Sequence, residues 1–344
     1  MVYSISIFVS ETQSAMKFGG KIGIVGAGAL GAFYGARLYR AGNDVHFLVR
    51  TGFELIREHG YEIRSCDGDF TIKPPVYSAP EDLGKCDLIL VGLKAFANHF
   101  LPEVLGPLAT PNTVVVTLQN GLGNEETIAE ALVKCGVHRS VAEASKQIIG
   151  GTAFLCSNRV APNVIIHSAH GFVRLAEFQG SPKERTFAVA QLFLDAGISC
   201  EVRESLAAIR WEKLVWNIPF NGLGVAAHQA DTAVILADPE LRTTAVEIMK
   251  EVIAAAKVNG VDLDERLVAD LIGKTEIMGH YKSSMQIDFE AGRPLEVEAI
   301  LGEPVRRAQQ KGFSAPRMHM LYALVRRMDQ LRQSNLENSQ SRSS

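Results

Sequence analysis

The chain has 344 residues, of which 47% are hydrophobic and 21% are charged, and its 38 acidic side chains outnumber 35 Lys and Arg to give a net charge of −3. This length exceeds one comfortable hydrophobic core and predicts two domains. The weak negative charge and the lack of any apolar run near the ~20 residues that span a bilayer argue against nucleic-acid and membrane partners.

Residues 1–20 precede the first clear strand, and we expect them to form a loosely ordered N-terminal extension, with an edge strand at Ile5–Val9 as the alternative. No Lys or Arg stands before Lys17, so the charged region of a secretory signal is missing. Glu11 and the absence of arginine argue against a mitochondrial presequence. We therefore expect a cytoplasmic protein.

The segment Lys21–Arg50 reads as a strand, a glycine turn, a helix and a second strand in consecutive order. The apolar run Ile22–Val25 is typical of a strand buried on both faces of a parallel sheet, and the predicted helix and second strand cover Leu30–Ala41 and Val45–Val49. The turn between the first strand and the helix has the form G-x-G-x-x-G and consists of Gly26, Ala27, Gly28, Ala29, Leu30 and Gly31. Such a turn presents the first N–H groups of a helix to a pyrophosphate. We predict a dinucleotide-binding turn, and a purely structural strand-turn-helix is the alternative.

The end of the second strand indicates which dinucleotide binds. An NAD site usually places a carboxylate there for the ribose hydroxyls, whereas this chain has Arg50 and then Thr51, with no carboxylate before Glu54. The guanidinium of Arg50 matches a 2′-phosphate, so we predict NADP(H) as the cofactor. The alternative is a solvated arginine at a strand end.

Two further predicted strands end in polar residues. After a short helix at Phe53–His59, the strand Cys86–Leu93 is followed directly by Lys94, and the strand Thr113–Leu118 leads into Asn120. Ligands of open α/β sheets bind outside the carboxyl ends of the strands, so we predict Lys94 and Asn120 at the cofactor site, with Asn120 also binding substrate. A solvated lysine and a turn asparagine are the alternatives.

Shorter apolar runs broken by glycine and polar residues follow between Val141 and Glu177, and we expect antiparallel strands there, including Val164–His167 and Phe172–Glu177. A helix at Lys183–Ala196 and a strand at Ile198–Val202 complete the first domain, for which we predict residues 21–203.

The second domain, predicted at residues 204–332, begins with a helix capped by Ser205. Lys213, Asn217 and Asn221 stand at i, i+4 and i+8 among apolar neighbours, so they share one helix face. A lone lysine with two amides in an apolar helix suggests a polar stripe that lines a cleft. The alternatives are a lysine that reaches solvent and an amide satisfied in the core.

Helices are also predicted at Asp238–Asn259, Asp264–Met278, Glu296–Lys311 and Pro316–Arg332, and residues 333–344 are expected to be a disordered tail. The polar segment Ser283–Glu296 is expected to be a loop that brings Ser284 and Glu296 toward a ligand. A first-turn glutamate that complements the helix dipole is the alternative for Glu296.

The five cysteines are scattered and never form C-x-x-C, and the nine histidines show no metal-binding spacing. We therefore predict reduced thiols and no metal, and we expect His167 and His170 to serve a strand or turn.

Together, the glycine motif, Lys94, the Gln119–Gly121 segment, WEKLVWNIPFNGL and SSMQIDFEAGRPLEVEAI resemble the 2-dehydropantoate 2-reductase (ketopantoate reductase) family over Lys21–Arg327. The resemblance implies an α/β fold, with a Rossmann domain followed by an all-α domain like the C-terminal domain of 6-phosphogluconate dehydrogenase, and a site between the two. It also implies NADPH-dependent reduction of 2-dehydropantoate to (R)-pantoate, a step toward pantothenate and coenzyme A.

By the same resemblance, Lys213 matches the catalytic lysine, Asn217, Asn221 and Ser284 match substrate-binding residues, and Glu296 matches a glutamate with catalytic and substrate-binding roles. The runner-up functions are reduction of another 2-oxoacid, an opine-type dehydrogenase and a non-catalytic NADP(H) sensor. A small-molecule 2-oxoacid is the expected partner, and the apolar helical domain is compatible with a homodimer.

Overall fold

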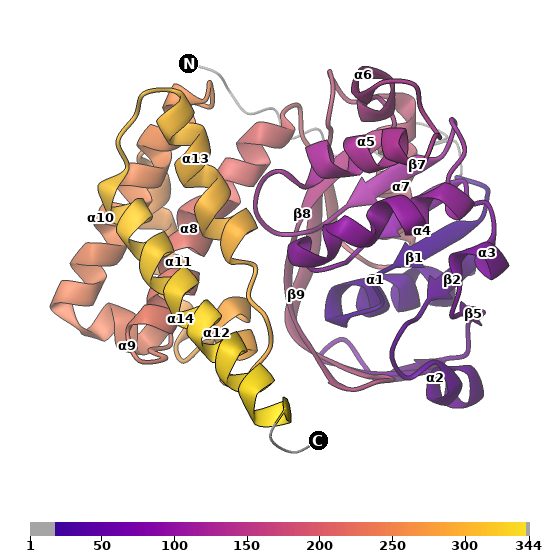
Figure 1. The fold of residues 1–344 in the computed structure, drawn as a ribbon, viewed down its shortest axis with the longest axis horizontal. Helices are drawn as coiled ribbons and strands as arrows, with labels where there is room; N and C mark the ends of the chain where they lie inside the picture. Colours follow the sequence, from indigo (N-terminus) through magenta and orange to yellow (C-terminus); the bar gives the residue numbers. More distant parts are fainter. Residues whose placement is uncertain (1–17, 342–344) are drawn as a thin grey trace. The chain divides into compact units, whose positions relative to one another are not determined.

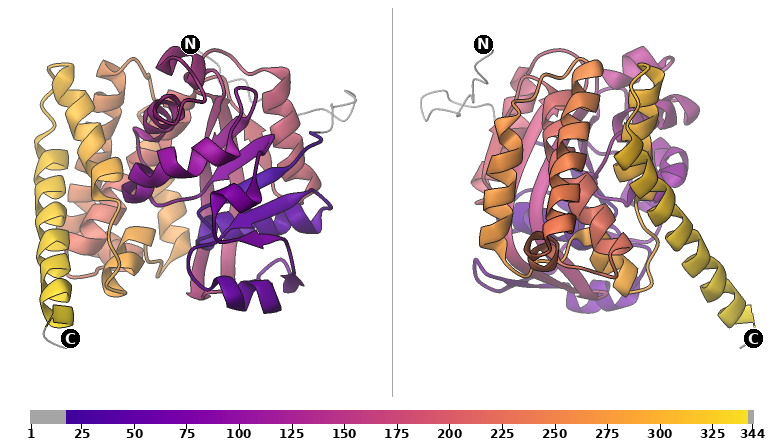
Figure 2. Two further views of the ribbon diagram at one scale, coloured as in Figure 1. Left: turned by 45° about the vertical axis from the view of Figure 1, so that its right-hand side comes forward. Right: turned by 90° about the vertical axis from the view of Figure 1, so that its left-hand side faces the viewer.

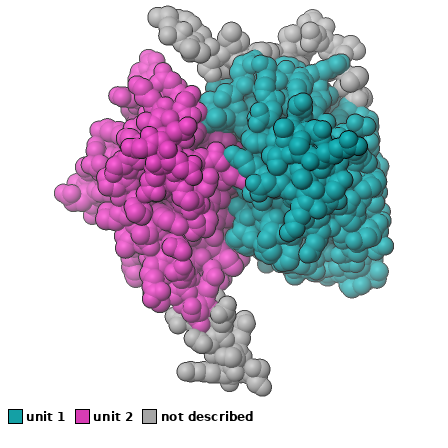
Figure 3. Space-filling model, turned by 45° about the horizontal axis from the view of Figure 1, so that its top comes forward, with its two compact units in different colours: residues 1–119, 124–209 teal, residues 120–123, 210–344 magenta. Residues whose placement is uncertain are grey.

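The computed structural model describes residues 18–341, which divide into two compact units (Figure 3). Unit 1 contains the chain up to Gln119 together with Asn124–Ile209, and unit 2 contains Asn120–Gly123 and the chain from Arg210 onward. The edge strand considered at Ile5–Val9 lies outside the described residues. The short segment Asn120–Gly123, called here the Asn120–Gly123 loop, groups with unit 2 although its neighbours in the chain on both sides belong to unit 1.

Unit 1 is built on a mixed sheet (Figure 1). Its strands are β1 (Ile22–Val25), β2 (Val45–Leu48), β3 (Tyr61–Ser65), β4 (Phe70–Ile72), β5 (Val76–Tyr77), β6 (Leu88–Val91), β7 (Val114–Thr117), β8 (Ile148–Ala161), β9 (Val164–Glu177) and β10 (Cys200–Val202). The order is β4-β3-β9-β8-β7-β6-β1-β2-β5, with β10 beside β9, and the strands from β5 to β8 along this path are parallel. This is a doubly wound Rossmann-type sheet, as predicted.

Helices cover both faces of the sheet, which explains why β1, β6 and β7 consist of buried residues throughout. They are α1 (Ala29–Arg40), α2 (Phe53–His59), α3 (Pro80–Leu83), η1 (Ala95–Phe100), α4 (Leu101–Leu108), α5 (Asn124–Lys134), α6 (Val141–Ser145) and α7 (Glu184–Asp195). One core cluster joins Phe33 of α1 to Phe193 of α7, and a second joins Leu105 of α4 to Ile128 of α5.

Strands β8 and β9 form a long antiparallel hairpin that packs against α1 (Figure 1). The Phe33 ring lies 4.4 Å from the His167 ring, and the Tyr34 hydroxyl donates to the Gly171 carbonyl at 3.1 Å. Two predictions made for this region are corrected. The break expected after His167 is an irregularity within β9, where His170 and Gly171 take positive φ, and the chain from Val141 to Ser145 is the helix α6.

Unit 2 is helical (Figure 2). Its helices are α8 (Leu206–Ala226), which begins within unit 1, and α9 (Thr232–Ala237), α10 (Pro239–Val258), α11 (Arg266–Met278), α12 (Ser284–Glu290), η2 (Glu298–Gly302), α13 (Glu303–Gln310) and α14 (Pro316–Ser341). Ser205 accepts from the Ala208 N–H at 3.2 Å and caps α8, as predicted. Within the described residues, no helix has the length and apolar character that crossing a bilayer requires.

Two further predictions about this unit are corrected. The expected loop at Ser283–Glu296 contains α12, because the Ser283 hydroxyl accepts from the Gln286 N–H at 3.3 Å and starts a helix. The last helix does not stop at Arg332, since α14 continues to Ser341 through part of the predicted disordered tail.

Candidate active site

The glycine turn between β1 and α1 has the shape of an anion-binding cradle. Gly26 has φ +91°, and a Cβ there would stand 2.4 Å from the Leu93 nitrogen, while a Cβ on Gly31 would stand 2.3 Å from the Gly26 oxygen. By contrast, a Cβ on Gly28 would meet no atom within 4 Å. No side chain caps α1, and its first turn carries no acidic residue. Open space beside uncapped N–H groups fits a pyrophosphate.

The end of β2 presents a cation. Arg50 is exposed and follows the buried Val49 directly, and the first carboxylate beyond it, Glu54, forms an ion pair with Arg57 on α2. The guanidinium of Arg50 at this position suits a phosphate group better than ribose hydroxyls, which a carboxylate usually binds.

Lys94 lies at the switch point of the sheet, although not directly at a strand end. Strand β6 stops at Val91, so Gly92 and Leu93 separate it from Lys94, which is half-buried and precedes η1. The strand order reverses between β1 and β6, and a Cβ on Gly92 would lie 3.1 Å from the Gly26 oxygen. The loop that carries Lys94 therefore lies beside the glycine turn, where ligands of such sheets bind.

A buried amide network holds this part of unit 1, and the sequence reasoning missed it. The Gln119 side-chain nitrogen donates to the Leu93 carbonyl at 2.9 Å and to Asn98 Oδ1 at 2.7 Å, and Asn98 Nδ2 donates to Asn124 Oδ1 at 3.0 Å. The three amides are almost fully buried. They fix the loop before Lys94 and both chain segments that flank the Asn120–Gly123 loop, a positioning role. Only Gln119, at a strand end, gave a signal in the sequence.

In unit 2, Lys213 and Asn120 lie in direct contact. Lys213 Nζ donates to Asn120 Oδ1 at 2.8 Å, and the Lys213 side chain is half-buried. The Asn120–Gly123 loop is held by the Leu122 N–H, which donates to the Ala299 carbonyl of η2 at 3.0 Å. The structure therefore brings together two residues that lie 93 positions apart in the chain and that we predicted separately.

The two amides of the predicted stripe are buried on α8, with exposed fractions of 6% for Asn217 and 1% for Asn221. Asn221 Nδ2 donates to the Asn217 carbonyl at 2.9 Å, and Asn221 Oδ1 accepts from the Met285 N–H at 3.2 Å. Asn221 thus joins α8 to the first turn of α12. Among the described residues, no hydrogen bond reaches the Asn217 side-chain amide, which argues against the alternative of an amide satisfied in the core.

Ser284 and Glu296 bracket the α12 segment. Ser284 is exposed at the first position of α12, next to Met285, which Asn221 contacts, while its buried neighbour Ser283 provides the cap. Glu296 is 5% exposed, and its carbonyl accepts from the Ile300 N–H of η2 at 3.1 Å. Burial distinguishes Glu296 from an ordinary first-turn glutamate, because a carboxylate is rarely buried without a specific reason.

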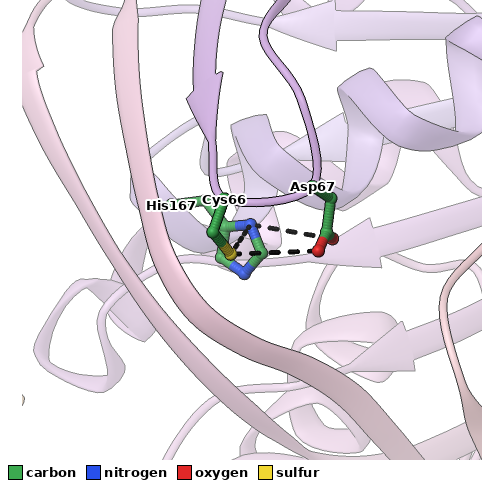
Figure 4. A group of neighbouring side chains, drawn as sticks. All are labelled: Cys66, Asp67 and His167. Carbon is green, nitrogen blue, oxygen red and sulfur yellow. Dashed lines mark hydrogen bonds and ion pairs between the residues drawn. The ribbon is translucent and has the colours of Figure 1, made fainter.

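One group of metal-ligand side chains lies elsewhere in unit 1 (Figure 4). Cys66 Sγ is 3.7 Å from His167 Nδ1, and Asp67 is within 4.0 Å of the same nitrogen. His167 Nε2 donates to the His170 carbonyl at 2.9 Å, and Nδ1 bonds to the Ser65 hydroxyl at 2.8 Å. Both ring nitrogens therefore serve the strand and turn, as predicted for this histidine, and we assign no metal to the group.

Comparison with known proteins places both units in one family. The family model described as ketopantoate reductase PanE/ApbA matches residues 22–180, and the model of the C-terminal domain of the same family matches residues 205–329. A 2-dehydropantoate 2-reductase from Nostoc sp. is 41% identical over 316 residues, which cover 90% of this chain and 95% of the relative.

Solved structures agree with these matches. A 2-dehydropantoate 2-reductase from Geobacter metallireducens is 44% identical with a TM-score of 0.83, covering 89% of this chain and 99% of that one. Another, from Methylococcus capsulatus, is 34% identical with a TM-score of 0.81, covering 91% and 97%. A D-mandelate dehydrogenase solved with NADH, 21% identical over 91% and 99% of the two chains, shares the fold with a TM-score of 0.81. With a glycine cradle in unit 1, a paired lysine and asparagine in unit 2 and family models that match both, the chain belongs to the ketopantoate reductase family.

Proposed function

We propose that this protein reduces 2-dehydropantoate to (R)-pantoate with NADPH, a step toward pantothenate and coenzyme A. The observation that carries the proposal is the hydrogen bond from Lys213 to Asn120 beside two buried amides on α8, in a chain of the ketopantoate reductase family. The resemblance of the sequence to that family assigns the same residues to catalysis and substrate binding.

Lys213 is the proposed proton donor. NADPH supplies the hydride, which reduces the carbonyl carbon of the substrate, so that negative charge develops on the carbonyl oxygen. A fixed ammonium group stabilises this charge more in the transition state than in the ground state and then gives up its proton. The hydrogen bond to Asn120 holds the amine of Lys213 in one orientation.

The neighbouring side chains are proposed to hold the substrate. The Asn217 side-chain amide makes no hydrogen bond to other described residues, so its N–H groups can donate to substrate oxygens and its oxygen can accept from a substrate hydroxyl. Ser284 offers an exposed hydroxyl. One N–H of the Asn221 amide donates within α8, and its oxygen accepts from the Met285 N–H of α12. The second N–H of this amide is therefore the group proposed to donate to a substrate. Glu296, buried at the start of the η2 segment, is proposed to accept a hydrogen bond from a substrate hydroxyl and to help set the charge of Lys213.

The cofactor side is proposed in unit 1. The glycine turn would hold the pyrophosphate, Lys94 and the loop around it would contact the nicotinamide half, and Arg50 would pair with the 2′-phosphate. Arg50→Ala should therefore lower the preference for NADPH over NADH, and an unchanged preference would return Arg50 to a solvated arginine.

The decisive experiment follows NADPH oxidation with 2-dehydropantoate and with other 2-oxoacids. Replacing Lys213 by Ala should lower kcat at least about 100-fold while NADPH still binds, because a positioned acid contributes roughly that much. Lys250→Ala is the matched control, since Lys250 is an exposed lysine of unit 2 that pairs with Glu247 at 2.9 Å. Near-normal turnover by the Lys213 variant would remove the proposed mechanism.

A second variant tests Glu296. Glu296→Gln should raise KM for the 2-oxoacid and lower kcat, because the buried carboxylate contacts substrate in this proposal. Unchanged constants, with a loss of stability no larger than about 1 kcal/mol, would support the helix-dipole alternative instead.

The same assays separate the runner-up functions. Faster turnover with a different 2-oxoacid would identify another substrate, a requirement for an amino acid would indicate an opine-type dehydrogenase, and NADPH binding without oxidation would indicate a sensor. The homodimer stays a prediction, which light scattering at several protein concentrations checks.

A further inference from the structure

The tip of the β8–β9 hairpin carries an arginine that contacts the glycine turn. Arg159 lies on β8 close to the turn into β9, and its Nη1 donates to the carbonyl of Ala27 at 3.4 Å. Ala27 is the residue between the first two glycines of the motif, 132 positions earlier in the chain. The long hairpin therefore delivers a guanidinium to the segment that cradles the dinucleotide.

The same hairpin tip also contacts the segment that follows β2. Gly52 has φ +79°, and a Cβ there would stand 2.3 Å from Pro162 Cβ. The tip is anchored to β3 as well, where the Glu62 N–H donates to the Asn163 carbonyl at 2.9 Å. In a Rossmann domain the adenosine ribose lies between the glycine turn and the end of the second strand. The hairpin tip touches the chain on both sides of that position.

Within the described part of the chain, no carboxylate pairs with Arg159. Other arginines on strands of the same sheet have acidic partners, with Arg174 bound to Glu201 at 3.0 Å and Arg64 bound to Glu62 at 2.7 Å. Among the described residues, Arg159 forms no ion pair, and its hydrogen bond to Ala27 is a long one. Most of its five N–H donors are therefore available to an anion.

A buried hydroxyl lies within reach of the same charge. The Tyr61 ring is fully buried, and its hydroxyl has no hydrogen-bond partner among the described residues. Burial raises the pKa of Tyr61, and the positive charge of Arg159 acts on that pKa in the opposite direction. The guanidinium of Arg159 therefore lies near this phenol, while Arg159 itself is exposed at the hairpin tip, where an anion can reach it.

We propose that Arg159 binds the adenosine 2′-phosphate of NADPH and forms, with Arg50, a two-arginine clamp contributed by two different parts of unit 1. The inference rests on the proposed use of NADPH and adds a specificity-determining residue to it. A phosphate monoester is close to a dianion at neutral pH, so two guanidinium groups balance its charge where one does not. The pyrophosphate, which NADH shares, is left to the glycine turn.

The test compares the binding of NADPH and NADH, measured by calorimetry, in the wild-type chain and in Arg159→Gln. Glutamine keeps a donor for the Ala27 carbonyl and removes the charge. We expect the Kd of NADPH to rise about tenfold or more, in line with the loss of a charge-assisted hydrogen bond, and the Kd of NADH to change by less than about threefold. Arg159→Lys should recover part of the NADPH affinity, because it keeps the charge without the fork of donors.

Controls separate a binding effect from a folding effect. Arg64→Gln removes another exposed arginine of unit 1, one that pairs with Glu62, and should leave both affinities unchanged. Adenosine 2′,5′-bisphosphate and 5′-AMP serve as truncated probes, and only the bisphosphate should lose affinity for Arg159→Gln. Equal thermal midpoints for wild type and variant show that the fold is kept.

The outcomes are distinct. A wild-type preference for NADPH that survives in Arg159→Gln overturns the clamp and leaves the proposed function intact. An equal loss of NADPH and NADH affinity also overturns it, since the contact would then be to a group the two cofactors share. A wild-type chain that binds NADH as tightly as NADPH overturns the cofactor choice of the proposed function and the clamp with it.

Discussion

Replacing Gly121 by Ala should damage catalysis through the backbone of the Asn120–Gly123 loop. Gly121 has φ +84°, and an added Cβ would stand 2.2 Å from the Ala299 oxygen and 2.4 Å from the Ala299 carbonyl carbon. Both atoms are backbone, so the loop has to move. That movement breaks the 3.0 Å hydrogen bond from the Leu122 N–H to the same carbonyl and displaces Asn120, the partner of Lys213.

Gly123→Ala is the matched control, because it separates backbone strain from the clash. Gly123 also has a positive φ, +89°, but its Cβ would come no closer than 3.7 Å to Glu303. The control should cost about 1–2 kcal/mol for the left-handed backbone alone. Gly121→Ala should cost that amount plus about 1–3 kcal/mol for a buried N–H left unpaired.

The assay is NADPH oxidation together with thermal unfolding. A shift of roughly 1 Å at a catalytic group costs about 100-fold in rate, so we expect that loss of kcat in Gly121→Ala and a far smaller one in Gly123→Ala. NADPH binding should change far less than kcat in both variants, since the glycine cradle belongs to unit 1 and Asn120 is only one of the predicted cofactor contacts. Equal losses of kcat in the two variants would refute the reasoning, because the clash with the Ala299 carbonyl would then have no effect on catalysis.

Two other features give predictions of their own. Glu251 of α10 is buried and accepts from two backbone N–H groups at the start of α14 at 2.7 and 3.3 Å, so Glu251→Ala should lower the free energy of unfolding by about 1–3 kcal/mol. The half-buried Glu247 of the same helix forms ion pairs with the exposed Lys250 and Arg317, so Glu247→Ala should change that free energy by less than about 0.5 kcal/mol in urea unfolding. Burial raises the pKa of Cys86 to about 11, so iodoacetamide at pH 9 should label the exposed Cys66 long before Cys86, and mass spectrometry reads the order. The pKa of Cys86 in the folded protein lies above its value of about 8.5 in the unfolded chain, so the contribution of Cys86 to stability is complete below about pH 8.5 and is lost as the pH rises toward 11. Cys86→Ala should remove this loss from a plot of unfolding free energy against pH.

The predicted strands and long helices were found because each repeats a local pattern over several residues. Continuous apolar runs give β1, β6 and β7, and the cap at Ser205 gives the start of α8. The sequences at the starts of α6 and α12 also contain a helix-capping pattern, which the predictions did not use. Each begins with a serine followed three residues later by Glu or Gln, and in both the serine hydroxyl accepts from that residue's N–H.

Other parts of the site have no local signal, because they depend on residues far apart in the chain. Nothing in the run around Asn98 indicates that its amide bridges Gln119 and Asn124. Similarly, the length of the β8–β9 hairpin depends on its packing against α1 and β3, and a positive φ at His170 resembles a strand end when only the sequence is read. Lys213 and Asn120 were each predicted, whereas their hydrogen bond required the fold.

The path of the chain through the Asn120–Gly123 loop limits how this protein can be divided. A fragment that starts at Ser205 would contain nearly all of the helical unit and yet lack four residues that pack inside it. Such a fragment would leave the Ala299 carbonyl without its donor and Lys213 without its amide. Cutting the gene at the apparent domain boundary should therefore yield a weakened helical piece, and a synthetic peptide that spans the missing loop is the natural supplement for restoring it.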